Sequence, residues 1–570
     1  MTARLLAAVL FGPVMTAGIA AAQAPMPPPP PAPPPIGTSY TCNGRPDPTG
    51  NSTLRGTILS LDTGTPVRDA QVQLGGAGLC NARTATDAYG RYELANLPAG
   101  RIYLSVAKAG YVTTSYGQRR PFEAQRSIEL LPAQTADNID VALPRAGVIV
   151  VRVTDEFGEP MSGVRVQAER AQFNDGRRQL LAEVHLDALT DDRGELRLYG
   201  LPAGEYYVNA MGSNPAPIPM PIAAIDRNRM YLPTYFPGTS DAAAAQRVVV
   251  QAGREQSVTF PLTVGRLARV SGTVVDPAGS SPNAQVMVSA AGSGITFSRR
   301  ASAQPSGVFS LTDVLPGLYT LSAVVRAGGS GEIGQVAALP LTVSGDDISG
   351  VALTLHRTGT LRGRFVYETP PPAGFSPVGS LRFSFSPVSS SEITVPVNVG
   401  SPNSSWQSDS TFAFTGLTNR VLPRLSPNSG WFLKAVRLGG RDVTDLPFDF
   451  TNGADVNDVE VVVTQKSSQI GGMVQDDKGA VSEYTALLFP DNRDLWVWPS
   501  RFIVASRADQ RGRFNLSGLP AGQYLIVALD YLEQGREFDP DLLARLRDQA
   551  TSITLGEGET KDVTLILFKN

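Results

Sequence analysis

Hydrophobic and polar residues alternate along short stretches of this chain, and turns rich in Asp, Gly and Pro separate the stretches. Tyr92 and Leu94, for example, alternate with polar neighbours, and so do the apolar residues of 102–106. A period of two predicts strands that bury one face. About seven such strands per hundred residues are typical of a β-sandwich. The exception is a stretch in which Asp539 suits a helix N-cap and Pro540 the first helical position, so a short helix is expected there.

One strand–turn–strand unit recurs five times, about a hundred residues apart. Its first copy places Asp87 and Gly90 at one turn and Pro98 and Gly100 at the next, residue types that favour tight turns. The other copies occupy 190–206, 307–319, 410–422 and 508–524. The fourth copy is degenerate, because Ser410 stands where the other copies have the turn glycine. A hundred residues is one small domain, so the repeat predicts five modules.

The predicted fold is all-β, a tandem array of about five Ig-like or prealbumin-like antiparallel β-sandwich modules. Modules one to five are expected at 41–146, 147–266, 267–358, 359–467 and 468–570. A closing strand runs almost directly into the next module, as at residues 143–147, and such short joins favour limited freedom between modules. Fully extended, the array would span on the order of 150 Å.

The beginning of the sequence has the pattern of a targeting segment. Arg4 precedes an apolar stretch from Leu5 to Phe11, and small residues around Ala24 suit a cleavage site, so residues 1–24 are expected to be a signal peptide. An uncleaved membrane anchor is the alternative. The mature protein would be secreted or periplasmic, with no integral membrane segment after cleavage. Residues 25–40 are proline-rich and predict an extended linker; recognition by a proline-binding domain is the alternative.

Charge and residue counts disfavour several kinds of binding and catalytic site. A net charge of −3 leaves no basic surface for nucleic acid. The two cysteines, Cys42 and Cys80, predict a disulfide in an oxidising compartment, and a metal site would need more ligands. The two histidines, His185 and His356, lie on predicted strands of different modules, which disfavours a His-based catalytic triad or zinc site. We therefore expect no cofactor, no metal and no catalytic residues.

Paired carboxylates are the remaining route to catalysis. Asp191-Asp192 and Asp476-Asp477 are the two conspicuous pairs. Both fall at predicted turns, where Asp can accept backbone hydrogen bonds. We interpret them as turn caps; calcium binding and catalysis are the alternatives.

Aromatic residues that interrupt the repeat are the candidate ligand contacts. Trp496 and Trp498 alternate in sequence, which predicts one strand with both rings on the same face. Tyr231, Tyr235 and Phe236 belong to a longer predicted loop of module two. Such rings can stack on sugar faces; the alternative is that they fill a core or pack against a neighbouring module.

The frame of the repeat is a G-x-V-like strand, a polar turn, an A-x-V strand and T-D-x-x-G-x-Y-x-L-x-x-L-P-A-G-x-Y. It resembles the carboxypeptidase regulatory-like domain family. The resemblance implies a transthyretin-like or prealbumin-like sandwich, close to starch-binding-domain-like folds, and those related folds imply carbohydrate binding. The catalytic domain that such modules accompany in metallocarboxypeptidases is not part of this sequence.

These expectations combine into a non-catalytic, secreted, multi-module binding or scaffold protein. Its expected partner is a glycan, a cell-envelope component or another protein. The alternative is a structural spacer or protein–protein assembly protein without a small ligand. A carboxylate-dependent hydrolase is a more remote alternative. Nothing in the sequence predicts an oligomeric state.

Overall fold

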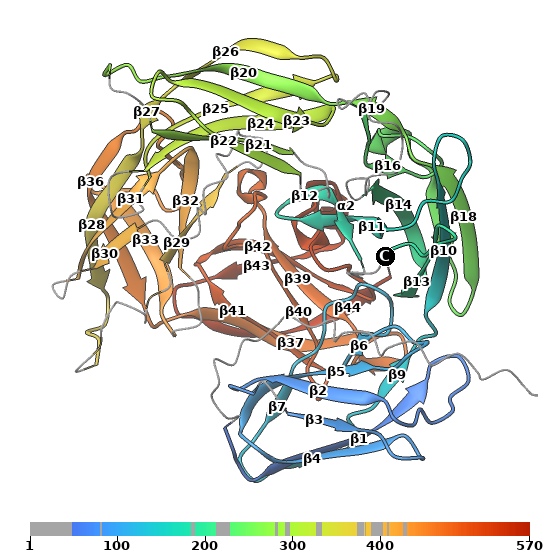
Figure 1. Ribbon diagram of the computed structural model, residues 1–570. Coiled ribbons are helices and arrows are strands. Elements are labelled where there is room, and N and C mark those ends of the chain that lie inside the picture. The colour runs from blue at the N-terminus through green and yellow to red at the C-terminus, as the bar shows by residue number, and fades with distance from the viewer. Residues whose placement is uncertain are drawn as a thin grey trace, which may run out of the picture. The chain divides into compact units, whose positions relative to one another are not determined.

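The computed structural model describes residues 48–79, 82–183, 189–212, 229–279, 283–290, 297–326, 333–372, 375, 381, 383–388, 403–406, 410–425 and 430–569. The predicted signal peptide, the proline-rich linker, the predicted Cys42–Cys80 disulfide and His185 lie outside these residues. Figure 1 shows the described part of the chain as a succession of sheets. This confirms the predicted fold class of tandem β-sandwich modules.

Modules one and two each contain a sheet around the first strand and a second, larger sheet. In module one, the first sheet has the order β4 (Arg91–Leu97), β1 (Ser52–Ser60), β8 (Thr135–Ala136), and β9 (Val141–Leu143) also pairs with β1. The second sheet has the order β3 (Arg83–Ala85), β2 (Gln71–Gly76), β5 (Gly100–Ala107), β6 (Thr114–Ser115), and β7 (Ile128–Leu130) also pairs with β5. In module two, the first sheet has the order β13 (Glu195–Leu201), β10 (Gly147–Thr154), β18 (Glu255–Pro261). The second sheet has the order β12 (Arg177–Ala182), β11 (Val164–Asn174), β14 (Gly204–Gly212), β16 (Thr234–Tyr235), and β17 (Arg247–Val250) also pairs with β14. A further pair joins β15 (Arg229–Tyr231) to β19 (Val264–Arg266), and η2 (Ala242–Ala244) precedes β17.

Modules three and four vary the same plan. Module three has β23 (Val308–Val314), β20 (Ala268–Val275), β26 (Ile348–Thr354), and β22 (Ser298–Ser302), β21 (Ala284–Ala290), β24 (Gly317–Arg326), β25 (Ile333–Val343), β27 (His356–Arg357). In module four, the first sheet has the strand order β30 (Asn403–Trp406), β31 (Thr411–Leu417), β28 (Gly359–Tyr367), β36 (Asp455–Thr464), β33 (Phe432–Leu438), β34 (Arg441–Asp442). The second sheet has the order β29 (Phe383–Pro387), β32 (Arg420–Leu425), β35 (Phe448–Asp449). Module four thus moves β33 into the sheet of its first strand.

Module five forms one continuous sheet, because its last strand pairs with both halves of the sandwich. The order is β38 (Gly479–Val481), β37 (Ser468–Asp476), β44 (Thr560–Phe568), β42 (Gly522–Leu529), β39 (Thr485–Pro490), β40 (Val504–Arg507), with β41 (Arg513–Leu519) beside β37 and β43 (Thr551–Leu555) beside β42. Its helical turns are η4 (Arg493–Leu495), η5 (Arg536–Phe538), α2 (Pro540–Leu546) and η6 (Arg547–Gln549). The expected helix is confirmed: Asp539 caps α2 by accepting from the N–H of Asp541, and Pro540 lies in its first turn.

The first strand of every module makes two different pairings. It runs antiparallel to the strand of the repeated motif and parallel to the strand that closes the module, as β37 does with β41 and β44. The same holds for β1, β10, β20 and β28. The sandwiches are therefore mainly antiparallel, but the first strand of each is paired in parallel with its closing strand, a feature that alternation alone does not predict.

A glycine opposite an aromatic residue recurs at the centre of this first strand. The cross-strand pairs are Gly56–Tyr92, Gly272–Phe309, Gly363–Phe412 and Gly472–Phe514. A Cβ at any of these glycines would lie 1.9–2.0 Å from a carbonyl oxygen of the closing strand or, for Gly56, of Ile139 just before that strand. Module two instead pairs Val151 with the smaller Leu196. The glycine thus makes room for the ring and the close backbone approach together.

The repeated turn residues act as the pattern predicts. One carboxylate oxygen of Asp87 accepts hydrogen bonds from the N–H groups of Tyr89 and Arg91, and Asp191 and Asp509 do the same in their own copies. The tyrosine of the motif adds a contact that the sequence did not reveal. The hydroxyls of Tyr206 and Tyr524 donate to the carbonyls of Pro202 and Pro520, each at 2.7 Å, and fix the second turn.

Each module has its own buried core, built from the inward positions of its strands. The five main clusters lie within 54–143, 149–262, 268–355, 361–463 and 470–565. Module five has a second core on the other face of its sheet, where Leu542, Leu543 and Leu546 of α2 pack on β39 and β42. Within the described residues, the model has no helix long and apolar enough to cross a membrane.

Candidate functional site: the polar junctions of module five and a groove on module four

Residues 117–126 of module one, between β6 and β7, contact module five through a buried set of charges. Arg507, at the end of β40, pairs with Glu123 at 3.0 Å and with Glu483 at 3.1 Å. Arg126 pairs with Glu483 at 2.7 Å and also donates to the carbonyl of Asp509. The side chains of Arg507, Glu123 and Arg126 are only 3–5% exposed. Two guanidinium groups therefore neutralise two carboxylates, and of the four side chains only that of Glu483, 29% exposed, reaches solvent.

Backbone contacts extend this junction. The guanidinium of Arg507 donates to the carbonyl of Gly117, and the N–H of Gln534 donates to the carbonyl of Phe122. The hydroxyl of Tyr531 donates to the carbonyl of Pro121 at 2.9 Å. Modules one and five are therefore in direct contact through both side chains and backbone.

Module two contacts the same junction through the C-terminal half of β11. The guanidinium of Arg170 lies 3.4 Å from the centre of the Phe122 ring, pairs with Glu533 of module five, and approaches Glu183 of its own module at 3.4 Å. Gly535 lies against the same strand, where a Cβ would be 2.1 Å from the carbonyl oxygen of Phe173. One arginine of module two thus contacts both module one and module five, whose contact residues are about 400 positions apart in the sequence.

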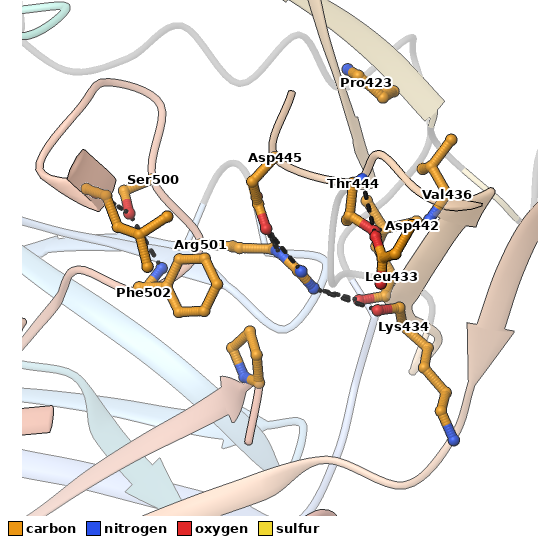
Figure 2. A network of polar contacts seen from close by, with 12 residues as sticks. Pro423, Leu433, Lys434, Val436, Asp442, Thr444, Asp445, Ser500, Arg501 and Phe502 are labelled. Atoms are coloured by element: carbon orange, nitrogen blue, oxygen red, sulfur yellow. Dashed lines mark hydrogen bonds and ion pairs between the residues drawn. The ribbon is translucent and has the colours of Figure 1, made fainter. Parts of the chain in front are cut away.

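Module four meets module five through a second arginine network, shown in Figure 2. Arg501 forms a bidentate pair with Asp445, with contacts of 2.8–3.1 Å, and donates to the carbonyls of Leu433 and Lys434. Arg424 of module four donates in the other direction, to the carbonyl of Pro499 at 2.9 Å. Burial lowers the pKa of Arg424 to about 10, against the opposing effect of Asp445. At neutral pH the group still carries its charge.

Most of the predicted aromatic residues face protein. Trp496 donates its indole N–H to the carbonyl of Pro490 and packs edge-on against Phe489. Trp498 lies against module two, where a Cβ on Gly176 would be 2.5 Å from the Trp498 Cβ. The predicted strand is absent from this described segment, because the side chain of Asn492 caps the turn η4 and Trp496 ends it. That part of the prediction was wrong; ligand contact by either ring stays a prediction.

The predicted tyrosine loop contains two short strands, β15 and β16. Tyr231 is partly buried and donates to Glu156 at 2.8 Å. Phe236 packs edge-on against Phe260 of the core. Tyr235 is 1% exposed, and its hydroxyl donates to Glu169 at 3.2 Å. Ligand binding at these three residues stays a prediction. In this structure the side chain of Tyr235 is surrounded by protein.

Glu169 is a buried acid that sequence patterns gave no reason to select. It is fully buried on β11, where Tyr235 and the amide of Asn209 donate to it. Burial raises the pKa of Glu169, and these two hydrogen bonds only partly oppose the shift. A carboxyl with this environment can mark a functional site, but it is also compatible with a structural contact between strands.

Replacing Glu169 with glutamine should flatten the dependence of stability on pH. A carboxyl whose pKa is raised by folding holds its proton more tightly in the folded state than in the unfolded chain. Its contribution is therefore fully present below the unfolded pKa and is lost as the pH rises through the folded pKa. Melting temperatures at about pH 5 and about pH 8 should fall less with rising pH in Glu169→Gln than in the parent. An identical fall in both proteins would contradict this account.

An open groove lies on the outer face of module four, over β31, β28 and β36. Its volume is about 870 Å³, and its lining residues are Arg362, Gly363, Arg364, Thr411, Phe412, Ala413, Asn457, Asp458, Val459 and Glu460. Arg364 pairs with Glu460, and Arg362 donates to the amide oxygen of Asn457 at 3.4 Å. The register of β28 against β36 shifts at this point, which leaves Asn457 and Asp458 as a bulge beside Arg362. The groove belongs to the degenerate copy of the repeat.

The remaining chemistry is sparse in the described part of the chain. His356 is partly exposed on β27, and its ring nitrogen lies 3.3 Å from the carbonyl oxygen of Arg357. Among the described residues there is no cluster of three or more His, Cys, Asp or Glu side chains placed to hold a metal. The carboxylates of Asp191 and Asp476 accept from backbone N–H groups, as turn caps do.

Comparison with known proteins supports the family resemblance for the first module. Residues 53–144 match the family model described as the carboxypeptidase regulatory-like domain. No curated protein matches the chain.

Similar solved structures include a Streptococcal ancillary pilin (14% identity, 53% of this chain and 98% of that one, TM-score 0.21) and the shaft pilin SpaA from Lactobacillus rhamnosus GG (14%, 38% and 98%, 0.17). The Bacillus anthracis TIE protein is also similar (10%, 87% and 68%, 0.13). With TM-scores this low, the function of this chain has to be argued from its own residues.

Proposed function

We propose that this chain is a non-catalytic binding and scaffold protein that works outside the cytoplasm, either secreted or periplasmic. The observation that carries the proposal is the buried contact of Arg507 with Glu123 and Glu483. Charged side chains that could otherwise perform chemistry hold module one on module five. Arg170 and Arg501 serve modules two and four in the same way. The charged side chains of these junctions thus bind modules to one another.

The proposed ligand is a carbohydrate or another component of the cell surface. Support comes from the related folds that the family resemblance implies and from the polar groove of module four, whose size suits a small ligand. The second candidate function is a structural assembly protein without a small ligand. It is favoured by the same junctions, which bring modules one, two, four and five into contact.

A binding screen separates these functions. The purified chain would be tested on immobilised neutral and acidic polysaccharides and on an isolated cell-envelope fraction, with release of reducing sugar monitored in parallel. Retention on a polysaccharide without release of sugar supports the proposed function. Retention only on a protein partner favours the assembly role. Release of sugar that one carboxylate substitution abolishes would overturn the non-catalytic proposal.

A further inference from the structure

The groove of module four differs from the other polar sites because its side chains face solvent. Arg362, Arg364, Asn457 and Asp458 are all exposed. In the junctions of module five, by contrast, the guanidinium groups of Arg501 and Arg507 are turned into protein and pair with carboxylates there. The groove therefore offers hydrogen-bonding groups to something outside the chain.

The sequence of module four opens the groove at its centre. The outer face of β31 carries Ala413, paired in register with Arg362, so a short side chain lies between longer ones. Gly363 points its missing side chain to the core, where a Cβ would be 1.9 Å from the carbonyl oxygen of Val459. Because only glycine fits at this close approach, residue 363 has to face the core. Arg362 and Arg364 on either side of it therefore face outward, and neither Gly363 nor Ala413 fills the hollow.

The charges of the groove define the class of ligand. Two arginines, Arg362 and Arg364, face two carboxylates, Asp458 and Glu460, so the lining is neutral overall. The guanidinium groups are donors only, the carboxylates are acceptors only, and Asn457 provides both. A neutral polyhydroxylated molecule presents donors and acceptors together and matches such a lining. A polyanion would be repelled by the carboxylates, and an apolar peptide would cover Arg362 and Asp458 without offering them hydrogen bonds.

We infer that the groove of module four is a binding site for a neutral glycan segment. This inference rests on the proposed carbohydrate-binding function and assigns it to one face of one module. Arg362 would donate to ring or hydroxyl oxygens, and Asp458 would accept from neighbouring hydroxyls. Hydrogen bonds to charged groups are stronger than those between neutral groups, so the loss of either side chain should have a measurable effect on affinity.

The test uses the full chain and isothermal titration with soluble starch, dextran and xyloglucan as neutral probes and alginate as the acidic probe. Arg362→Ala should weaken binding of the neutral polymer by at least about tenfold. The matched control is Arg55→Ala, which removes the residue before the equivalent glycine, Gly56, on the first strand of module one. The control should bind as the parent does. Melting curves of both variants should overlay the parent curve, because both side chains are exposed.

Asp458→Asn provides the second variant. Asp458 has a left-handed backbone, with φ of 59°, which asparagine also tolerates, so the fold is retained. The substitution gives the lining a net positive charge. It should weaken binding of the neutral polymer, and the parent itself should show no preference for alginate.

Several outcomes would overturn the assignment. If the parent binds a neutral glycan and Arg362→Ala binds equally well, the groove is not the site, although the proposed function survives. If alginate alone binds and Asp458→Asn strengthens that binding, the ligand class is acidic instead. If the parent binds no polysaccharide, the carbohydrate function itself fails together with the site.

Discussion

Replacing Arg507 with methionine is expected to release module one from module five and to lower the free energy of unfolding by about 3–5 kcal/mol. Methionine has a similar length and keeps the apolar contacts of the stem, but it leaves Glu123 without its cation. Glu123 is 3% exposed and would keep only the backbone N–H groups of Arg119 and Arg120 as donors, and a buried carboxylate without a countercharge is costly. The loss of the contact to the carbonyl of Gly117 adds to the effect.

Two measurements check this prediction. Urea denaturation should show the lower stability, and small-angle scattering of the variant should show a larger maximum dimension than that of the parent. The control is Arg513→Met, whose guanidinium forms an ion pair with Asp562 in which both side chains are more than 40% exposed. That pair should be worth no more than about 1 kcal/mol. Equal effects of the two substitutions would contradict the role of the junction.

A double variant isolates the pair itself. Glu123→Gln removes the charge that Arg507→Met leaves unpaired, so the double variant should be more stable than Arg507→Met alone. The coupling energy between the two sites should exceed about 1 kcal/mol, as expected for contacting residues. Additive effects would mean that Arg507 acts through packing and not through Glu123.

The sequence predicted the local structure of this chain well, since local structure depends on neighbouring residues. Asp87 and Gly90 are sufficient to define a turn, and Asp539 with Pro540 is sufficient to define the start of α2. The alternation of Trp496 and Trp498 was misleading because a side-chain cap at Asn492 competes with strand formation. A period of two over three residues is too short to decide between these outcomes.

The junctions were beyond sequence reasoning because their partners are far apart. Arg126 and the carbonyl of Asp509 are separated by 383 residues, and neither position stands out in its own module. The groove of module four was indicated only indirectly, by the degenerate repeat. Its actual lining depends on the bulge at Asn457 and Asp458, which follows from strand register and not from residue type.

Glycine at the centre of the first strand is the feature whose loss should harm a module most directly. Gly472→Ala should lower the stability of module five by about 2–4 kcal/mol, because its Cβ would lie 1.9 Å from the carbonyl oxygen of Val563 and 3.0 Å from the Phe514 ring. No rotamer relieves this clash, since the Cβ position is set by the backbone. The strands β37 and β44 would have to separate where they pair in parallel.

The neighbouring glycine supplies a matched control for the same substitution on the same strand. At Gly471 a Cβ would find its nearest atoms at 3.5 and 3.8 Å, which is ordinary van der Waals contact. Gly471→Ala should therefore be neutral or stabilising by up to about 1 kcal/mol, since alanine restricts the unfolded chain. Urea denaturation followed by far-UV circular dichroism compares the stability of the two variants with that of the parent. If both alanine variants unfold at the same urea concentration, close approach at Gly472 is not what this position requires. If Gly472→Ala alone is unstable, the repeated pairing of glycine with an aromatic residue is a steric requirement. The pairing of Val151 with Leu196 in module two is then the alternative solution to the same packing problem.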